Sequence, residues 1–251
     1  MFFKKKPFAR FVNLVPGVEV AHPIVRSNEI HPKWLREAAI DFKQRDASAR
    51  PNEIMASSSR CPGLTEYFKQ GFIVTAPMDF TITTTNKHDA FQFDYYGPVS
   101  LQGKPYIGSH HTPQLAKFMP MREDTHDWLV KVNTYWRINS SSDIVFLQMP
   151  IAYPDHNVFT AAHGIIDCQN YTEINVQLFW HKLNDTVLVE AGTPLCQLIP
   201  IPRNLAVDLI VERPTEEDKY ISEAWAYLTT QKFKKDMKSF LAQAKKLLGG
   251  R

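Results

Sequence analysis

Apolar residues at every second position predict β-strands in the last third of the chain. They recur from residue 174 to residue 180, and the same spacing resumes at Val187 and Val189 after the polar break 182–186. A period of two is typical of a strand with one buried face. We therefore expect residues 174–180 and 187–189 to form a β-hairpin.

A turn and a third strand follow this hairpin. The turn at residues 191–194 contains Gly192, which accepts a positive φ, and Pro194, which lacks a backbone N–H donor. The apolar run 195–201 has the length of a strand. We expect a tight corner at Gly192 between the two strands.

Runs rich in β-branched and aromatic residues predict further strands. The predicted strands are 72–74, 80–84, 91–95, 128–132, 135–138, 144–149 and 206–211. We expect the first three of them to form a meander. Phe8 and Phe11 near the N-terminus indicate either an edge strand or an arm that packs on a neighbour. Between the third and fourth strands, residues 98–127 are polar and predicted to be irregular, and long loops are uncommon unless they bind something.

Helical spacing appears at three places in the chain. Apolar residues from Trp34 to Phe42 lie on one face of a helix that starts near Pro32 and ends before Asp46. A short helix over 64–70 should stop at Gly71. The third helix begins at an N-cap, Thr215, and is followed by acidic first-turn residues. Its apolar face comprises Trp225, Leu228, Phe233, Met237, Phe240, Leu241, Ala244 and Leu248. Its basic end is read either as a solvated face or as a docking element for a partner protein or an acidic surface.

These elements predict a mainly β protein with one N-terminal helix and a C-terminal helical extension. A chain of 251 residues can form one core with appendages. We expect an N-terminal arm and helix over 1–60, a β-rich core over 61–213 and an amphipathic helix over 214–251.

The composition says more about the partners and the cellular compartment of the protein than about its activity. A net charge of +3 is too small to indicate nucleic acid as a partner. The three cysteines form no C-x-x-C pair, which favours a reduced compartment. No apolar run approaches the ~20 residues of a membrane span, and no signal-peptide core follows the N-terminal lysines.

The adjacent histidines His110 and His111 are weak candidates for metal binding. Neighbouring residues on a strand point to opposite sides, and no second metal-binding pattern accompanies them. The sequence therefore predicts no metal site.

Residues 163–201 resemble the family of deoxyuridine triphosphatases (dUTPases) and deoxycytidine triphosphate (dCTP) deaminases. That family has a motif close to G-x-I-D-x-x-Y-x-G-E, followed later by G-D-R-x-A-Q-L-I. The matching positions here are Gly164, Ile166, Asp167, Glu173, Gly192, Gln197, Leu198 and Ile199. The resemblance implies a β-clip core, in which Asp167 would orient an attacking water near Glu173.

Several parts of the family's substrate site are changed in this chain. Asn170 stands where the family has a sugar-stacking tyrosine, and Tyr171 comes one place late. The arginine of the later motif and the glycine-rich final motif have no counterpart. The family's phosphate-binding arginine and serine compare only with Arg137, Ser140 and Ser141, which a serine-rich turn explains equally well. Substrate-binding candidates are therefore Arg137, Ser140, Ser141, Asn170, Tyr171 and Gln197.

The chain is also similar to uncharacterised proteins of tailed bacteriophages, including those of cyanobacteria. They share its W-R-I segment at 136–138 and its G-T-P-L-x-Q-x-I-P turn at 192–200. The expected function is a non-catalytic binding or structural protein without a cofactor, located in the host cytoplasm or the virion. A homo-oligomer, with a trimer as the first expectation, follows because the similar enzymes are trimers. The alternative is a deoxynucleoside triphosphate hydrolase or deaminase that uses Asp167, Glu173 and Mg²⁺.

Overall fold

The structure is a computed structural model of the whole chain. It describes residues 6–48, 57–97, 100–101, 103–110, 119, 121–216, 218–219 and 222. Within these ranges, no helix combines the length and the apolar character that crossing a bilayer requires.

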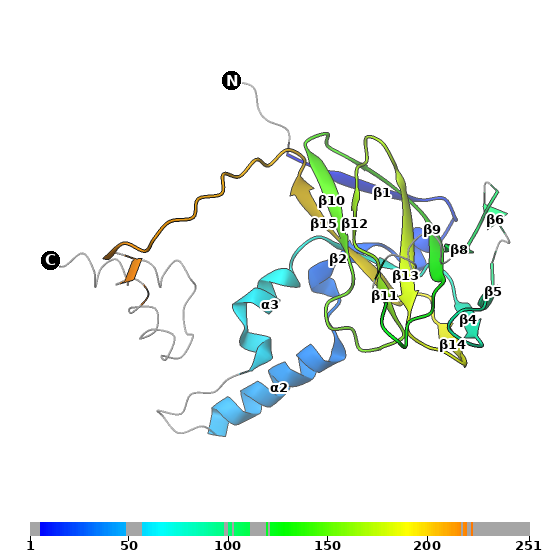
Figure 1. The fold of residues 1–251 in the computed structure, drawn as a ribbon, viewed down its shortest axis with the longest axis horizontal. Coiled ribbons are helices and arrows are strands. Elements are labelled where there is room, and N and C mark those ends of the chain that lie inside the picture. Colours follow the sequence, from blue (N-terminus) through cyan, green and yellow to red (C-terminus); the bar gives the residue numbers. More distant parts are fainter. Residues whose placement is uncertain are drawn as a thin grey trace. The chain divides into compact units, whose positions relative to one another are not determined.

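The protein is mainly β, and its strands pair in antiparallel sheets (Figure 1). One five-stranded sheet, sheet A, contains β1 (Ala9–Asn13), β8 (Ile107–His110), β9 (Leu129–Ser140), β11 (Phe159–Ala161) and β13 (Glu173–Trp180). The second, sheet B, contains β2 (Val25–Arg26), β3 (Phe72–Thr75), β10 (Ile144–Met149), β12 (Gly164–Ile166) and β15 (Pro194–Pro202). Smaller sheets are formed by β4 (Phe80–Thr84), β5 (Gln92–Tyr95) and β14 (Asp185–Val189), and by β6 (Ser100–Leu101) with β7 (Lys104–Pro105). The mainly β class predicted from the sequence is confirmed.

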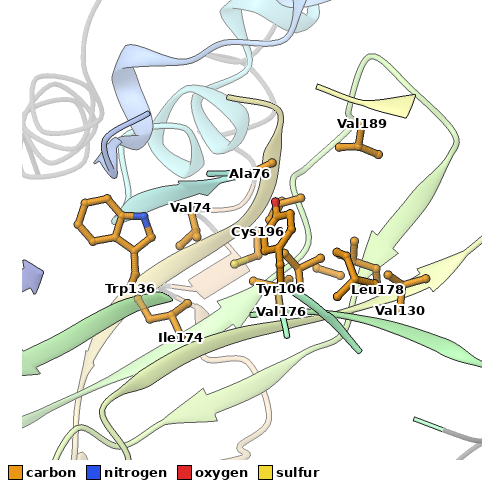
Figure 2. Close-up of a cluster of buried hydrophobic side chains, with 14 of the residues drawn as sticks. Val74, Ala76, Tyr106, Val130, Trp136, Ile174, Val176, Leu178, Val189 and Cys196 are labelled. Carbon is orange, nitrogen blue, oxygen red and sulfur yellow. The ribbon is translucent and has the colours of Figure 1, made fainter. Parts of the chain in front are cut away.

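Sheets A and B share one hydrophobic core. Val74 and Cys196 from sheet B gather with Trp136, Ile174 and Val176 from sheet A, as Figure 2 shows. The rings of Phe11 and Phe72 also meet edge to face, with centroids 5.1 Å apart. Burial of this apolar surface is the main stabilising contribution to the fold.

Strand β13 carries the alternation that the sequence predicts. Its residues alternate between half-buried and fully buried along the whole strand, with Ile174 and Trp180 completely enclosed. It pairs with β9 on one side and with β11 on the other. The two predicted strands over 128–138 form the single strand β9, in which Tyr135 has a φ of 56°.

The predicted β-hairpin is wrong, although both of its strands exist. Strand β14 follows β13 in the chain but pairs with β4, so the two strands lie in different sheets. The predicted meander is confirmed for its second pair, since β4 pairs with β5, and wrong for its first, since β3 pairs with β15 and β2. Periodicity identifies a strand, but it carries no information about the strand's partner.

The predicted turn at Gly192 is confirmed. Gly192 has a φ of 86°, and its N–H donates to the carbonyl of Ala76 at 2.8 Å. The third predicted strand is β15, which starts two residues later. At the N-terminus, β1 pairs with β9 at the edge of sheet A, as the edge-strand interpretation predicts.

Two irregular regions differ from their predictions. Residues 206–211 form no strand, and four of their apolar side chains are exposed to solvent: Val207, Leu209, Ile210 and Val211. The segment predicted as irregular over 98–127 contains β6, β7 and β8. His110 therefore lies on a strand, and His111 is outside the described residues.

The helices are short apart from α2. Helix α2 runs over Lys33–Ser48, slightly beyond its predicted end, and α3 runs over Pro62–Tyr67. Helix α1 spans Val18–Ala21, and 3-10 turns lie at Ser27–Glu29 and Ser58–Arg60. Asp155 caps α2, because its carboxylate accepts from the N–H groups of Lys33 and Trp34. Helix α3 ends at Tyr67, before its predicted end at residue 70, and Gly71 follows after a short turn with a φ of 71°.

The start of the C-terminal helix has the predicted cap. The Thr215 hydroxyl accepts from the N–H of Asp218 at 3.2 Å, and the Asp218 carboxylate accepts from the N–H of Thr215 at 2.8 Å. This reciprocal arrangement is a capping box. The predicted apolar face, from Trp225 onward, lies outside the described residues.

The chain forms two compact units. One comprises residues 1–34 and 63–205 and holds both large sheets, and the other comprises residues 35–62 and 206–251. In the second unit, the Ser57 hydroxyl donates to the Ala38 carbonyl at 3.3 Å, and the Arg60 guanidinium lies over the Phe42 ring. The three-part domain division stays a prediction, because compactness alone does not define folding units.

Candidate functional site

Asp167 lies in a turn directly after the short strand β12. Its carboxylate accepts hydrogen bonds from the Gln169 N–H and from the Asn170 side-chain amide, each at 2.9 Å. Its backbone carbonyl accepts from the N–H groups of Asn170 and Tyr171. Aspartate readily organises turns in this way, because its short side chain reaches the backbone two residues on.

The Arg203 guanidinium completes the environment of Asp167. Two of its nitrogens donate to the two carboxylate oxygens, one of them at 2.5 Å, and the side chains are both about a quarter exposed. Arg203 is itself held by the Ser142 carbonyl, which accepts from Nε at 2.7 Å. Bidentate pairs of this kind are stronger and more directional than neutral hydrogen bonds.

These contacts make Asp167 a poor proton acceptor. The hydrogen bonds from Arg203, helped by the Gln169 N–H, lower the pKa of Asp167 from 3.8 to about 2. A general base works best when its pKa lies near the working pH. The carboxylate therefore stays ionised with both oxygens engaged, which fits a structural role.

Glu173 forms a second polar cluster, on β13. Its carboxylate accepts from the Lys104 ammonium and lies 3.8 Å from the Arg137 guanidinium on the neighbouring strand β9. The Tyr171 hydroxyl is 3.4 Å away and accepts from the Asn175 amide. The hydrogen bond from Lys104 lowers the pKa of Glu173 and raises that of Lys104.

The hollow beside Glu173 is too small for a nucleotide. It measures about 20 Å³ and is lined by Leu14, Lys104, Asn133, Tyr135, Trp136, Arg137, Glu173, Ile174 and Asn175. One water molecule needs about 10–15 Å³ measured in this way. As it stands, the hollow has room for one or two water molecules.

The serine candidates lie at the end of β9 and in the turn after it, beside the N-terminal strand β1. Ser140 is buried opposite Ala9 on β1, and its hydroxyl donates to the Ser141 carbonyl at 3.2 Å. The Ser141 hydroxyl accepts from the Phe8 N–H at 2.9 Å. The Ser141 hydroxyl therefore helps to hold the start of β1 at the edge of sheet A, whereas the Ser140 hydroxyl bonds its own neighbour in the chain.

The sequence candidates fall into separate groups. Asp167 and Asn170 belong to the Arg203 cluster, and Arg137 and Tyr171 belong to the Glu173 cluster; the two carboxylates share no partner among the described residues. Gln197 is buried elsewhere on β15, where its amide donates to the Gln70 carbonyl at 2.7 Å. Within the described ranges, no group of three or more metal-ligating side chains comes together.

Sequence analysis missed Arg203 and Lys104. Arg203 directly follows β15 and is 36 residues from Asp167, and Lys104 is 69 residues from Glu173. Neither residue stands in a motif, so no local pattern marks it. Arg203 reaches Asp167 because the end of β15 lies near the end of β12, and Lys104 reaches Glu173 of β13 from the separate strand β7.

No model of a protein family matches the chain, and a search of curated proteins found no match either.

Proposed function

We propose that the chain is a non-catalytic binding or structural protein of a tailed bacteriophage that reuses a dUTPase-like β-clip core. The resemblance over residues 163–201 supports this fold, because its matched positions lie on β12, β13, β15 and the turns between them. The observation that carries the non-catalytic part of the proposal is the ion pair between Asp167 and Arg203.

That ion pair occupies the carboxylate that the similar enzymes use to orient water. A water-activating carboxylate needs an oxygen free to accept a proton, and it needs a substrate held beside it. Both oxygens of Asp167 are bound by Arg203, and the hollow beside Glu173 holds no more than a water molecule or two. Positioning can supply about 7–11 kcal/mol of a catalysed barrier, so its loss removes most of the activity.

The alternative is a deoxynucleoside triphosphate hydrolase or deaminase that uses Mg²⁺. The feature that favours it is the pair of cations at Glu173, since Lys104 and Arg137 lie within reach of one carboxylate. Two cations so placed suit a phosphate group, provided that the cluster opens. Asp167 would then have to exchange Arg203 for a water molecule.

The first prediction separates these two functions. Pyrophosphate release from dUTP and ammonia release from dCTP are measured with Mg²⁺ present, for the wild type, Asp167→Asn and a control, Asp185→Asn. Asp185 is an exposed carboxylate at the start of β14. We expect no turnover by any of the three proteins. Turnover of about 1 per second in the wild type and the control that disappears in Asp167→Asn would establish the enzyme instead.

Homo-oligomer formation belongs to the same proposal. Residues 205–211 expose five apolar side chains in an extended segment without a strand partner, and contiguous exposed apolar surface marks interaction sites. A second copy of the chain is the partner we propose, with a trimer as the first expectation. The helix that begins at Thr215 is a further candidate for contact with a protein partner. We place the protein in the host cytoplasm or in the virion.

A further inference from the structure

A cleft in the first unit lies apart from both carboxylate clusters. Its volume is about 110 Å³. It is lined by Ser27, Ile30, His31, Pro32, Phe68, Ile73, Ile151, Ala152, Pro154, Asp155, His156, Pro194 and Gln197. These residues come from the turn before α2, the end of α3, strands β3 and β15, and the loop after β10.

The walls of the cleft are mostly apolar and partly aromatic. Phe68 is buried, and the His31 ring meets its edge at 88° with centroids 5.9 Å apart. Ile73 on β3 and Ile151 in the loop contribute aliphatic surface. Aromatic rings gain from edge-to-face and offset packing against one another, so the walls suit an aromatic ligand.

One polar group in the cleft lacks a hydrogen bond. Ser27 is 1% exposed, and its hydroxyl has no hydrogen-bond partner among the described residues. Its backbone is fixed, because its N–H donates to the Gly71 carbonyl at 3.1 Å. Burying a hydroxyl without a partner is unfavourable, and such groups are uncommon in native proteins. Ser27 also lines the cleft, so a small shift of its side chain would let the hydroxyl bind a polar atom of a ligand.

The charges around the cleft are compensated. The Asp155 carboxylate accepts from the N–H groups at the start of α2, at 2.7 and 2.9 Å from Lys33. The Nδ1 atom of His156 accepts from the Val158 N–H at 3.3 Å, so the neutral ring carries its proton on Nε2. Burial lowers the pKa of His156, which keeps that ring neutral at pH 7. The cleft thus offers hydrogen-bond donors without an unpaired charge.

We propose that this cleft binds a compact, uncharged aromatic molecule that carries one hydrogen-bonding oxygen. The ring lies between Phe68, Ile73 and Ile151, and the oxygen contacts the Ser27 hydroxyl. At about 110 Å³ the cleft is smaller than the apolar cavity of about 150 Å³ that is known to hold benzene, so it admits at most a single ring. Nucleotides are excluded by both size and charge, so this site is independent of the function proposed above.

The direct test uses 4-fluorophenol and fluorobenzene as probes, with binding followed by ¹⁹F NMR on the full chain. Small fragments of this size bind in the ~mM range. We expect saturable binding of both probes to the wild type. Ser27→Ala removes the hydroxyl and leaves the ring site, so it should weaken 4-fluorophenol binding about fivefold and change fluorobenzene binding by less than about twofold.

A filling variant tests whether binding occurs in this cleft. Ala152→Leu adds side-chain volume to the lining, and Ala162→Leu adds the same volume at a half-buried alanine outside it. We expect Ala152→Leu to lose binding of both probes and Ala162→Leu to retain it, with melting curves confirming that both variants fold. Unsaturable binding to the wild type, equal binding by the two leucine variants, or equal effects of Ser27→Ala on both probes would each overturn the proposal.

Discussion

The turn at Asp167 ties together the end of β12 and the end of β15. Arg203 binds both carboxylate oxygens, and it also reaches back to the Ser142 carbonyl in the turn before β10. One charged pair therefore joins three segments that are adjacent in sheet B. Removing one partner of such a pair leaves the other without its counter-charge, which is more damaging than the net contribution of the pair suggests.

This pair predicts a specific acid dependence of stability. The pKa of Asp167 is lowered in the folded protein, so below its ordinary value the unfolded chain binds more protons than the folded chain. The stabilisation is therefore complete above the ordinary value of 3.8 and is lost as the pH falls towards about 2.

Urea denaturation between about pH 6 and about pH 2 measures this dependence. We expect the wild type to unfold at higher urea than Asp167→Asn near pH 6 and the difference to shrink as the pH falls below about 4. Asp185→Asn, at the exposed start of β14, serves as the control and should follow the wild type. A constant difference between Asp167→Asn and the wild type over the whole range would contradict the lowered pKa.

At the scale of elements, the corner between α3 and β3 depends on Gly71. A Cβ atom placed there would lie 2.0 Å from the Leu198 carbonyl oxygen on β15, and the residue also has a positive φ. Gly103 has a similar φ of 74°, but nothing lies within 4 Å of its added Cβ. The two glycines therefore differ in crowding and share the same backbone conformation.

We expect Gly71→Ala to destabilise the protein more than Gly103→Ala. The left-handed conformation alone costs about 1–2 kcal/mol for alanine. Overpacking against the β15 backbone adds about 1–3 kcal/mol at Gly71. Thermal unfolding of both variants measures the difference in stability. Equal melting temperatures would contradict the prediction, because they would show that β15 shifts to make room for the added methyl group without cost.

Helices, strands and turns could be predicted where the residues that determine them are neighbours in the sequence. The alternation in β13 and the cap at Thr215 depend on neighbouring residues, and both are confirmed. The pairing of β14 with β4 joins Asp185 to Thr84, about one hundred positions apart, and no local pattern specifies it. The segment 206–211 has a strand-like composition, but burial and a partner strand make a strand, and this segment has neither.

The difference between local and long-range determinants also explains which residues of the candidate site could be predicted. A sequence motif identifies Asp167, Asn170 and Glu173, but their partners Arg203 and Lys104 come from distant parts of the chain. The Ser27 cleft was missed altogether, because its lining is assembled from five separate stretches of chain and contains no motif.

For the whole molecule, the exposed segment 205–211 is the feature that bears on assembly. Leu205, Val207, Leu209, Ile210 and Val211 are each more than two-thirds exposed. Single exposed apolar residues are common on protein surfaces, but five within seven positions form a patch. Burying such a patch against a second copy would stabilise an oligomer by the hydrophobic effect.

The combined variant Val207→Ser, Leu209→Ser and Val211→Ser should therefore lower the oligomeric mass to that of a monomer. Gel filtration with light scattering measures this mass. A matched control replaces three scattered exposed residues, Val20, Ile40 and Leu188, by serine and should keep the oligomer. A monomeric wild type, or equal masses for all three proteins, would contradict the proposed role of the segment.

The three cysteines differ sharply in exposure. Cys61 is exposed, whereas Cys168 and Cys196 are buried. Burial raises the pKa of Cys168 and of Cys196, which disfavours the thiolate that reacts with thiol reagents. Cys196 lies on β15 between β10 and β3, so a reagent reaches it when this part of sheet B opens.

The reaction rates of the buried cysteines therefore report how often the core opens. With excess 5,5′-dithiobis(2-nitrobenzoate), one thiol should react at once and two should react later, at rates set by opening. Cys61→Ser should abolish the fast phase and leave the slow ones unchanged. Three thiols reacting together in the folded wild type would show a core open to solvent. A measured slow phase would give the lifetime of the closed sheet without any added probe.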